Sequence, residues 1–214
     1  GSIAATATLN ATDAGWWENT GKHTGNNKNY YAARNYRNYF TFDLSTIKQT
    51  VIGAQLLLTE PVTGYASTDP TETYTVFDVA TPAAALGATN TEQTSIYDDL
   101  GTGTSYGSRE YSAADNGTTT TIDLNPAAIA ALNAARGHTF AAGGAITTLS
   151  AKRSPTQNIA AVLDLDLGEG PTGIDLAHRL RKIAPQIGIV ILSTYVEPRL
   201  IGDRKSTRLN SSHR

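Results

Sequence analysis

Hydrophobic and polar residues alternate with a period of two in several short runs along residues 1–150. The clearest run is 39–44, which carries Phe40, Phe42 and Leu44 on one face and Tyr39, Thr41 and Asp43 on the other. This period predicts a strand with one buried side. Similar runs, separated by turn residues, predict further strands over 3–9, 54–59, 73–79, 118–124 and 139–149.

One helix is predicted before the last of these strands. Asn125 suits an N-cap, Pro126 suits the first helical position, and Gly137 suits the C-terminal stop. Ile129 and Leu132 give the helix a narrow apolar stripe. Short antiparallel strands with one covering helix predict a mainly β domain over residues 1–150, a jelly-roll-like antiparallel β-sandwich.

The pattern changes after residue 150. A polar linker, 151–157, precedes an apolar run over 159–163 that ends at Asp164. Apolar residues then recur at helical spacing over 174–184, and 188–192 is continuously apolar, as in a buried parallel strand. This order predicts a partial βαβ unit with Asp164 at the carboxyl end of a strand, where open α/β sheets place their sites.

Charge divides the chain at the same place. Residues 1–150 carry a net charge of −6 and residues 151–214 a net charge of +4, which give −2 for the whole chain. The pI of about 6.1 predicts no nucleic-acid partner. No stretch approaches the roughly 18 apolar residues of a membrane span. The chain has no Cys, which excludes disulfides and Cys-ligated zinc, and because it has no Met we expect Gly1 to mark a processed or truncated end.

Aromatic residues gather near the N-terminus, among several asparagines. The candidate binding residues are Trp16, Trp17, Tyr30 and Tyr31. Flat rings stack on the apolar faces of sugars while amides reach sugar hydroxyls, so the cluster predicts a carbohydrate-binding surface. The alternative is that these rings pack in the core of the sandwich.

Carboxylates are the other candidate ligands. Asp98 and Asp99 on a loop could join Asp115 in binding calcium through hard oxygen ligands, or they could form a solvated acidic loop. His23 and His138 lie in no metal-ligand pattern, and no Gly-x-Ser-x-Gly elbow presents a nucleophile. We therefore expect no catalytic residues and no required cofactor.

Two segments carry a resemblance to known proteins. Residues 37–45 (RNYFTFDLS), followed by 52–58 (IGAQLLL), resemble the centre of DNRLRE-type and related PEP-CTERM-exported β-sandwich proteins of bacteria. Shorter blocks extend the likeness over most of residues 3–148. The resemblance implies an exported, extracellular or cell-surface domain without catalytic activity, whose function in the family is usually unassigned. Together with the strand pattern and the aromatic residues, it leads us to expect a domain that binds carbohydrate or matrix, and a structural component of the surface is an alternative.

Residues 158–203 resemble a fragment of a response-regulator receiver domain, a cytoplasmic module. The resemblance implies that Asp164 is the phosphoacceptor, that Ser193 contacts the phosphoryl group and that the backbone carbonyl of Asp166 binds Mg²⁺. The family's acidic pair on the first strand and its lysine after the fifth strand have no counterpart. Because these residues are missing, phosphorelay is the alternative function and not the leading one. We also expect a fragment of this size to be weakly ordered on its own.

The last residues match neither part. Within the basic tail 204–214, which we expect to be disordered, residues 205–213 (KSTRLNSSH) look like the translated sequencing-adapter tail of assembled metagenomic reading frames. A basic partner-binding tail is the alternative. We interpret the chain as a chimeric reading frame whose complete fold is residues 1–150.

Overall fold

The computed structural model describes residues 6–149, 158–159 and 189–193, and this part of the chain is mainly β, as predicted. Its strands are β1 (Thr6–Glu18), β2 (Ala32–Ala33), β3 (Tyr36–Asp43), β4 (Gly53–Thr59), β5 (Glu72–Phe77), β6 (Ser105–Tyr111), β7 (Thr119–Asp123), β8 (Thr139–Ile146), β9 (Asn158–Ile159) and β10 (Ile189–Ser193). Its helices are α1 (Ala83–Leu86), α2 (Thr94–Asp99), the 3₁₀ turn η1 (Ala113–Asp115) and α3 (Pro126–Ala134).

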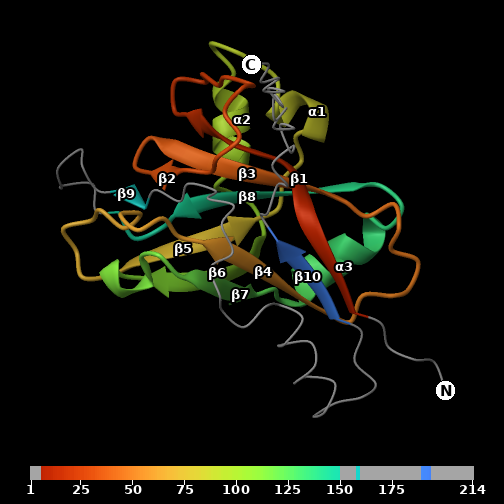
Figure 1. Cartoon of the computed structure of the whole chain (residues 1–214). Helices are drawn as coiled ribbons and strands as arrows, with labels where there is room; N and C mark the ends of the chain where they lie inside the picture. The colour runs from red at the N-terminus through yellow and green to blue at the C-terminus, as the bar shows by residue number, and fades with distance from the viewer. Residues whose placement is uncertain (1–5, 150–157, 160–188, 194–214) are drawn as a thin grey trace, which may run out of the picture.

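The strands form two sheets that share β1 (Figure 1). The first sheet has the order β6-β5-β8-β3-β1, and its pairs are antiparallel. The second has the order β1-β10-β4-β7, and β10 is parallel to both neighbours. In β1, residues 6–10 pair with β10 and residues 11–18 pair with β3, with a register shift between Ala11 and Asp13. Such a bulge bends a strand, which lets β1 pass from one sheet to the other.

One core lies between the two sheets. Its buried side chains come from β3, β4 and β7 among others, and they include Phe40, Phe42, Leu56, Leu58 and Ile122, each at most 1% exposed. Burying a side chain of this size contributes about 1.5–3 kcal/mol. The period of two predicted for β3 and β4 therefore identifies core residues correctly. The inner faces of the two sheets pack on this core in a sandwich-like arrangement.

The outer face of the first sheet is also covered. Tyr39 lies in a second buried cluster with Trp17, Leu86 of α1, Ile96 of α2 and Leu100. Both helices lie above this sheet in Figure 1. The prediction that residues 39–44 bury one side alone is therefore wrong, because two short helices absent from the sequence-based prediction cover the second side.

The predicted covering helix is confirmed as α3. The side chain of Asn125 accepts a hydrogen bond from the Ala128 amide at 3.1 Å, and Pro126 occupies the first turn. Ala128 and Leu132 are fully buried against the core. Asn133 fixes the preceding loop through its amide group, which donates to the Val51 carbonyl at 2.7 Å and accepts from the Val51 amide at 2.8 Å.

The predicted βαβ unit falls mostly outside the described residues. Its two described pieces pair with strands of the sandwich and not with each other: β9 lies beside β2, and β10 lies between β1 and β4. Among the described residues, no helix is long and apolar enough to cross a membrane.

Candidate functional site

The four candidate aromatic residues separate into two buried and two partly exposed side chains. Trp16 and Trp17 are neighbours on β1, so they point to opposite faces of the sheet. Trp17 is completely buried in the outer cluster, where its indole Nε1 donates to the Leu86 carbonyl at 3.0 Å. Tyr30 is 2% exposed, and its ring packs edge-on against Phe40 with the centroids 5.0 Å apart. Trp17 and Tyr30 are therefore core residues.

Trp16 and Tyr31 instead contact each other and Tyr36. The ring centroids of Trp16 lie 6.1 Å from Tyr31 and 5.1 Å from Tyr36, both in edge-to-face geometry, and Tyr31 and Tyr36 lie 5.0 Å apart. All three side chains are partly exposed. Burial, followed by the neighbouring Tyr36, raises the pKa of Tyr31 above its usual value. We call these three residues the aromatic cluster.

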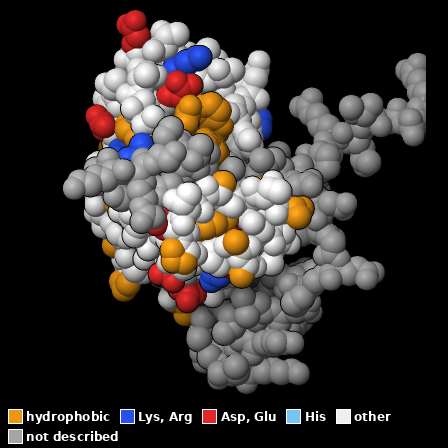
Figure 2. Space-filling model, turned by 90° about the vertical axis from the view of Figure 1, so that its left-hand side faces the viewer, with side chains coloured by type: hydrophobic (Ala, Val, Ile, Leu, Met, Phe, Trp, Pro, Cys, Tyr) orange, Lys and Arg blue, Asp and Glu red, His pale blue; other side chains and the backbone are white. Residues whose placement is uncertain are grey.

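Amide groups lie beside this cluster in the chain. Exposed Asn19 and Asn35 follow β1 and precede β3, and their side chains meet at 3.3 Å, the Asn19 amide donating to the Asn35 oxygen. A backbone bond from Asn19 N to Asn35 O, at 2.9 Å, holds the two segments together. On the face drawn in Figure 2, apolar side chains form several small groups with charged side chains among them and no single broad patch. An aromatic cluster with amide neighbours suits a small polar ligand better than a large apolar surface.

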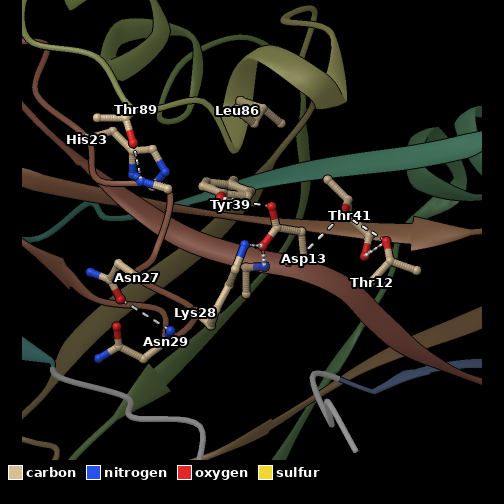
Figure 3. Close-up of polar contacts among 12 residues, drawn as sticks. Thr12, Asp13, His23, Asn27, Lys28, Asn29, Tyr39, Thr41, Leu86 and Thr89 are labelled. Carbon is tan, nitrogen blue, oxygen red and sulfur yellow. Dashed lines mark hydrogen bonds and ion pairs between the residues drawn. The ribbon is translucent and has the colours of Figure 1, made fainter. Parts of the chain in front are cut away.

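A polar network that sequence reasoning missed lies under α1, on the outer face of the first sheet (Figure 3). Asp13 of β1 accepts from Lys28 Nζ at 2.8 Å and from the Tyr39 hydroxyl at 3.3 Å. The imidazole of His23 stacks on Trp17 with the centroids 4.9 Å apart and meets Tyr39 edge-on at 5.7 Å. These residues are separated along the chain and match no spacing motif, so only the fold reveals the network.

Burial of His23 favours the neutral form of its imidazole. Burial lowers its pKa, and the hydrogen bond to the Trp16 carbonyl and the charge of Asp13 offset this only in part. The Trp16 carbonyl can only accept, so Nδ1, at 2.8 Å, carries the proton. Nε2 is buried without a hydrogen-bond partner among the described residues, and in the neutral ring it is an acceptor. The ring stacks on Trp17, whose indole bonds to the Leu86 carbonyl of α1, so the network packs Trp17 and α1 against the sheet.

The three candidate calcium ligands do not come together. The Asp99 carboxylate accepts from the Thr81 backbone and hydroxyl at 2.8 and 2.6 Å, and Asp98 is exposed beside it on α2. Asp115 is paired with Arg109 at 2.7 Å and forms a capping box with Ser112. Within residues 6–149, 158–159 and 189–193, no group of three or more acidic or histidine side chains could hold a metal ion. The three carboxylates therefore do not form the predicted group within the described residues, because Asp99 binds the Thr81 segment and Asp115 binds Arg109 and Ser112.

A second feature that the sequence did not reveal is a buried carboxylate between the sheets. Glu60, directly after β4, is 3% exposed, and its Oε2 has no hydrogen-bond partner in the described structure. Burial raises its pKa to about 7, and the charge of Asp115 acts in the same direction, while Tyr30 and Arg109 act against it. A charged residue at the end of a strand is usually exposed, so the sequence alone does not predict that Glu60 is buried.

The receiver-like candidates lie almost entirely beyond the described residues. Asp164 and Asp166 are outside them. Ser193 is the last residue of β10, where its backbone is level with Asn10 and Leu57. The structure therefore does not assemble a phosphorylation site from the residues it describes.

No protein-family model matches the chain, and no curated protein matches it. The resemblances to exported β-sandwich proteins and to receiver domains therefore stay predictions from the sequence.

Proposed function

We propose that the sandwich is a non-enzymatic, extracellular binding domain whose ligand is a carbohydrate, and that Trp16, Tyr31 and Tyr36 form the binding surface. The observation that carries the proposal is the partial exposure of all three rings in one contact group. By contrast, Trp17 and Tyr30, which fill the core, are at most 2% exposed.

The surroundings of the aromatic cluster support the same function. Asn19 and Asn35 offer amide groups that can exchange their mutual 3.3 Å contact for sugar hydroxyls. The cluster also rests on rigid elements, because Trp16 lies in the ladder between β1 and β3, opposite Asn38. Ring surfaces held by a sheet lose little conformational entropy when a ligand stacks on them.

A glycan array followed by calorimetry tests this proposal. The whole chain is expected to bind at least one oligosaccharide on the array. Trp16→Ala and Tyr31→Ala are each expected to weaken binding of that oligosaccharide at least tenfold, which corresponds to about 1.4 kcal/mol.

Tyr65→Ala is the matched control. Tyr65 is also a partly exposed tyrosine, but its hydroxyl donates to the Asp69 carbonyl in a different loop. Its replacement is expected to leave the affinity unchanged. A chain that binds no glycan, or a Trp16→Ala variant with unchanged affinity, would contradict the proposal. In that case concentration-dependent sedimentation would distinguish a structural, self-associating surface component.

The alternative, a receiver phosphorylated on Asp164, has a separate test. Labelling by a small phosphodonor with Mg²⁺ is compared between the wild-type chain and Asp164→Asn. Equal labelling of the two chains would exclude this alternative.

A further inference from the structure

In the second sheet, the position between β1 and β4 is filled by a strand from far along the chain. β10 occupies it, between residues 6–10 of β1 and Gly53–Leu57 of β4, with five register pairs on each side. β10 begins at residue 189, whereas the last strand of the sandwich before it, β8, ends at Ile146. In Figure 1 the blue arrow of β10 lies among strands coloured for the first 125 residues.

The strands on either side of β10 have the composition of interior strands. Residues 6–10 (TATLN) and 53–57 (GAQLL) contain no charged side chain. The true edges of the two sheets differ: β6 carries Arg109 and Glu110, and β7 carries Asp123. Charges on edge strands prevent the addition of further strands. Their absence beside β10 indicates that this position is built to receive a strand.

The two segments that flank this position, residues 6–10 and 53–57, are its walls, and they also contribute to the core. Ala54 and Leu56 are buried, and Ala7 and Leu9 pack against the same hydrophobic cluster. Without a strand between them, two ladders of backbone N–H and C=O groups would be left open in the middle of a sheet. By register, the residues level with these walls are Val190 and Leu192.

We propose that the slot between β1 and β4 is a strand-binding site, and that its ligand is an extended, uncharged segment with the chemistry of Ile189–Ser193. In this chain the segment is supplied in cis, by residues far beyond the sandwich. Binding is by main-chain hydrogen bonds to both walls, so a free peptide of this type also enters the slot when the cis strand is weakened. This inference is independent of carbohydrate binding at the aromatic cluster.

Cross-linking tests the position of the strand in the full chain. The protein has no cysteine, so Thr8→Cys with Ile191→Cys introduces the only two thiols. Positions 8 and 191 are register partners, and Thr8 is exposed. The pair is expected to oxidise readily to a disulfide. The matched control, Thr8→Cys with Val190→Cys, is offset by one residue and is expected to oxidise at least fivefold more slowly, because successive residues face opposite sides.

The form of the cross-linked product identifies the donor. A cross-linked monomer supports the strand in cis, and a cross-linked dimer supports the same strand donated by a second copy. Equal rates for the two cysteine pairs, or no disulfide in either, would overturn the proposal.

A second experiment tests binding in trans. Ile191→Pro removes a backbone N–H from the centre of β10, whereas Ile191→Val keeps it. Hydrogen exchange of the amides in residues 6–10 and 53–57 is expected to become at least tenfold faster in the proline variant alone. A free peptide spanning residues 188–194 should restore protection, and the same peptide with proline at position 191 should not. Unchanged exchange in Ile191→Pro, or equal effects of the two peptides, would contradict strand binding.

Discussion

Glu60 offers the sharpest test of the packing between the sheets. Glu60 is 3% exposed, and its Oε2 lacks a hydrogen-bond partner among the described residues. The groups around it are mostly neutral hydroxyls, with Tyr30, Tyr74 and Tyr111 all buried in the same core. Ionisation of Glu60 therefore places a poorly compensated charge in an apolar region, and Glu60→Gln removes that charge while keeping the size of the side chain.

The magnitude follows from the pKa. Burial raises the pKa of Glu60 from 4.5 to about 7, and each tenfold change in acidity corresponds to about 1.4 kcal/mol. Between pH 4.5 and 7 the folded state binds more protons than the unfolded state, so the contribution of Glu60 to stability falls as the pH rises and is constant above about pH 7. The total loss is roughly 3 kcal/mol. Glu60→Gln is therefore expected to gain stability relative to wild type over this pH range.

Urea denaturation at pH 4.5, 6 and 8 measures this effect. The difference in unfolding free energy between Glu60→Gln and wild type should grow from pH 4.5 to pH 8, reaching about 3 kcal/mol in favour of the variant. A difference independent of pH, or one that favours the wild type at pH 8, would refute the reasoning.

Glu72→Gln is the control. Glu72 is equally buried, but its two oxygens accept from the Ser67 and Thr148 hydroxyls at 2.6 and 2.5 Å. An amide NH₂ cannot accept such a bond, so this variant should lose about 1–3 kcal/mol.

Three further substitutions test other contacts of the fold. Trp17→Phe is expected to lower the unfolding free energy by about 1–3 kcal/mol, because the Leu86 carbonyl loses its indole donor; equal stability in urea denaturation would show that the 3.0 Å bond contributes nothing. Asn125→Ala removes the N-cap of α3 and should cost about 1 kcal/mol, measured as a lower thermal midpoint, whereas Asn125→Gly should cost only a few tenths. Gly144→Ala would place a methyl group on the Tyr74 hydroxyl and near Asn38, so thermal unfolding should occur at a lower temperature by the equivalent of about 1–3 kcal/mol; a variant as stable as wild type would contradict this close approach.

Local sequence patterns predicted the elements whose signals are local. The alternation in β3 and β4 identified Phe40, Phe42, Leu56 and Leu58 as core residues, and the capping residues of α3 placed that helix within a few positions. The same patterns missed β6, whose sequence SYGSREY interleaves small and charged residues with two buried tyrosines. They also missed α1 and α2, of four and six residues, because so short a helix presents no repeating apolar stripe.

The candidate site depended on pairings that no local pattern contains. Alternation alone implies that Trp16 and Trp17 face opposite ways, but which of them is covered depends on α1 packing on the outer sheet face. Tyr36 joins the aromatic cluster because β1 and β3 align Glu18 with Tyr36, which brings it within reach of Trp16. The carboxylate of Asp99 likewise accepts from Thr81, which is distant in sequence, and that of Asp115 pairs with Arg109 of β6, a strand that the patterns missed.

The most direct test of the proposed function uses Trp16 as its own probe. In Trp17→Phe, Trp16 is the sole tryptophan of the chain, so all tryptophan emission reports on the aromatic cluster. Addition of the oligosaccharide selected on the array should shift this emission to shorter wavelength and reduce its quenching by acrylamide, with saturation at the affinity found by calorimetry. Emission and quenching that stay unchanged at saturating oligosaccharide would contradict carbohydrate binding at Trp16, Tyr31 and Tyr36.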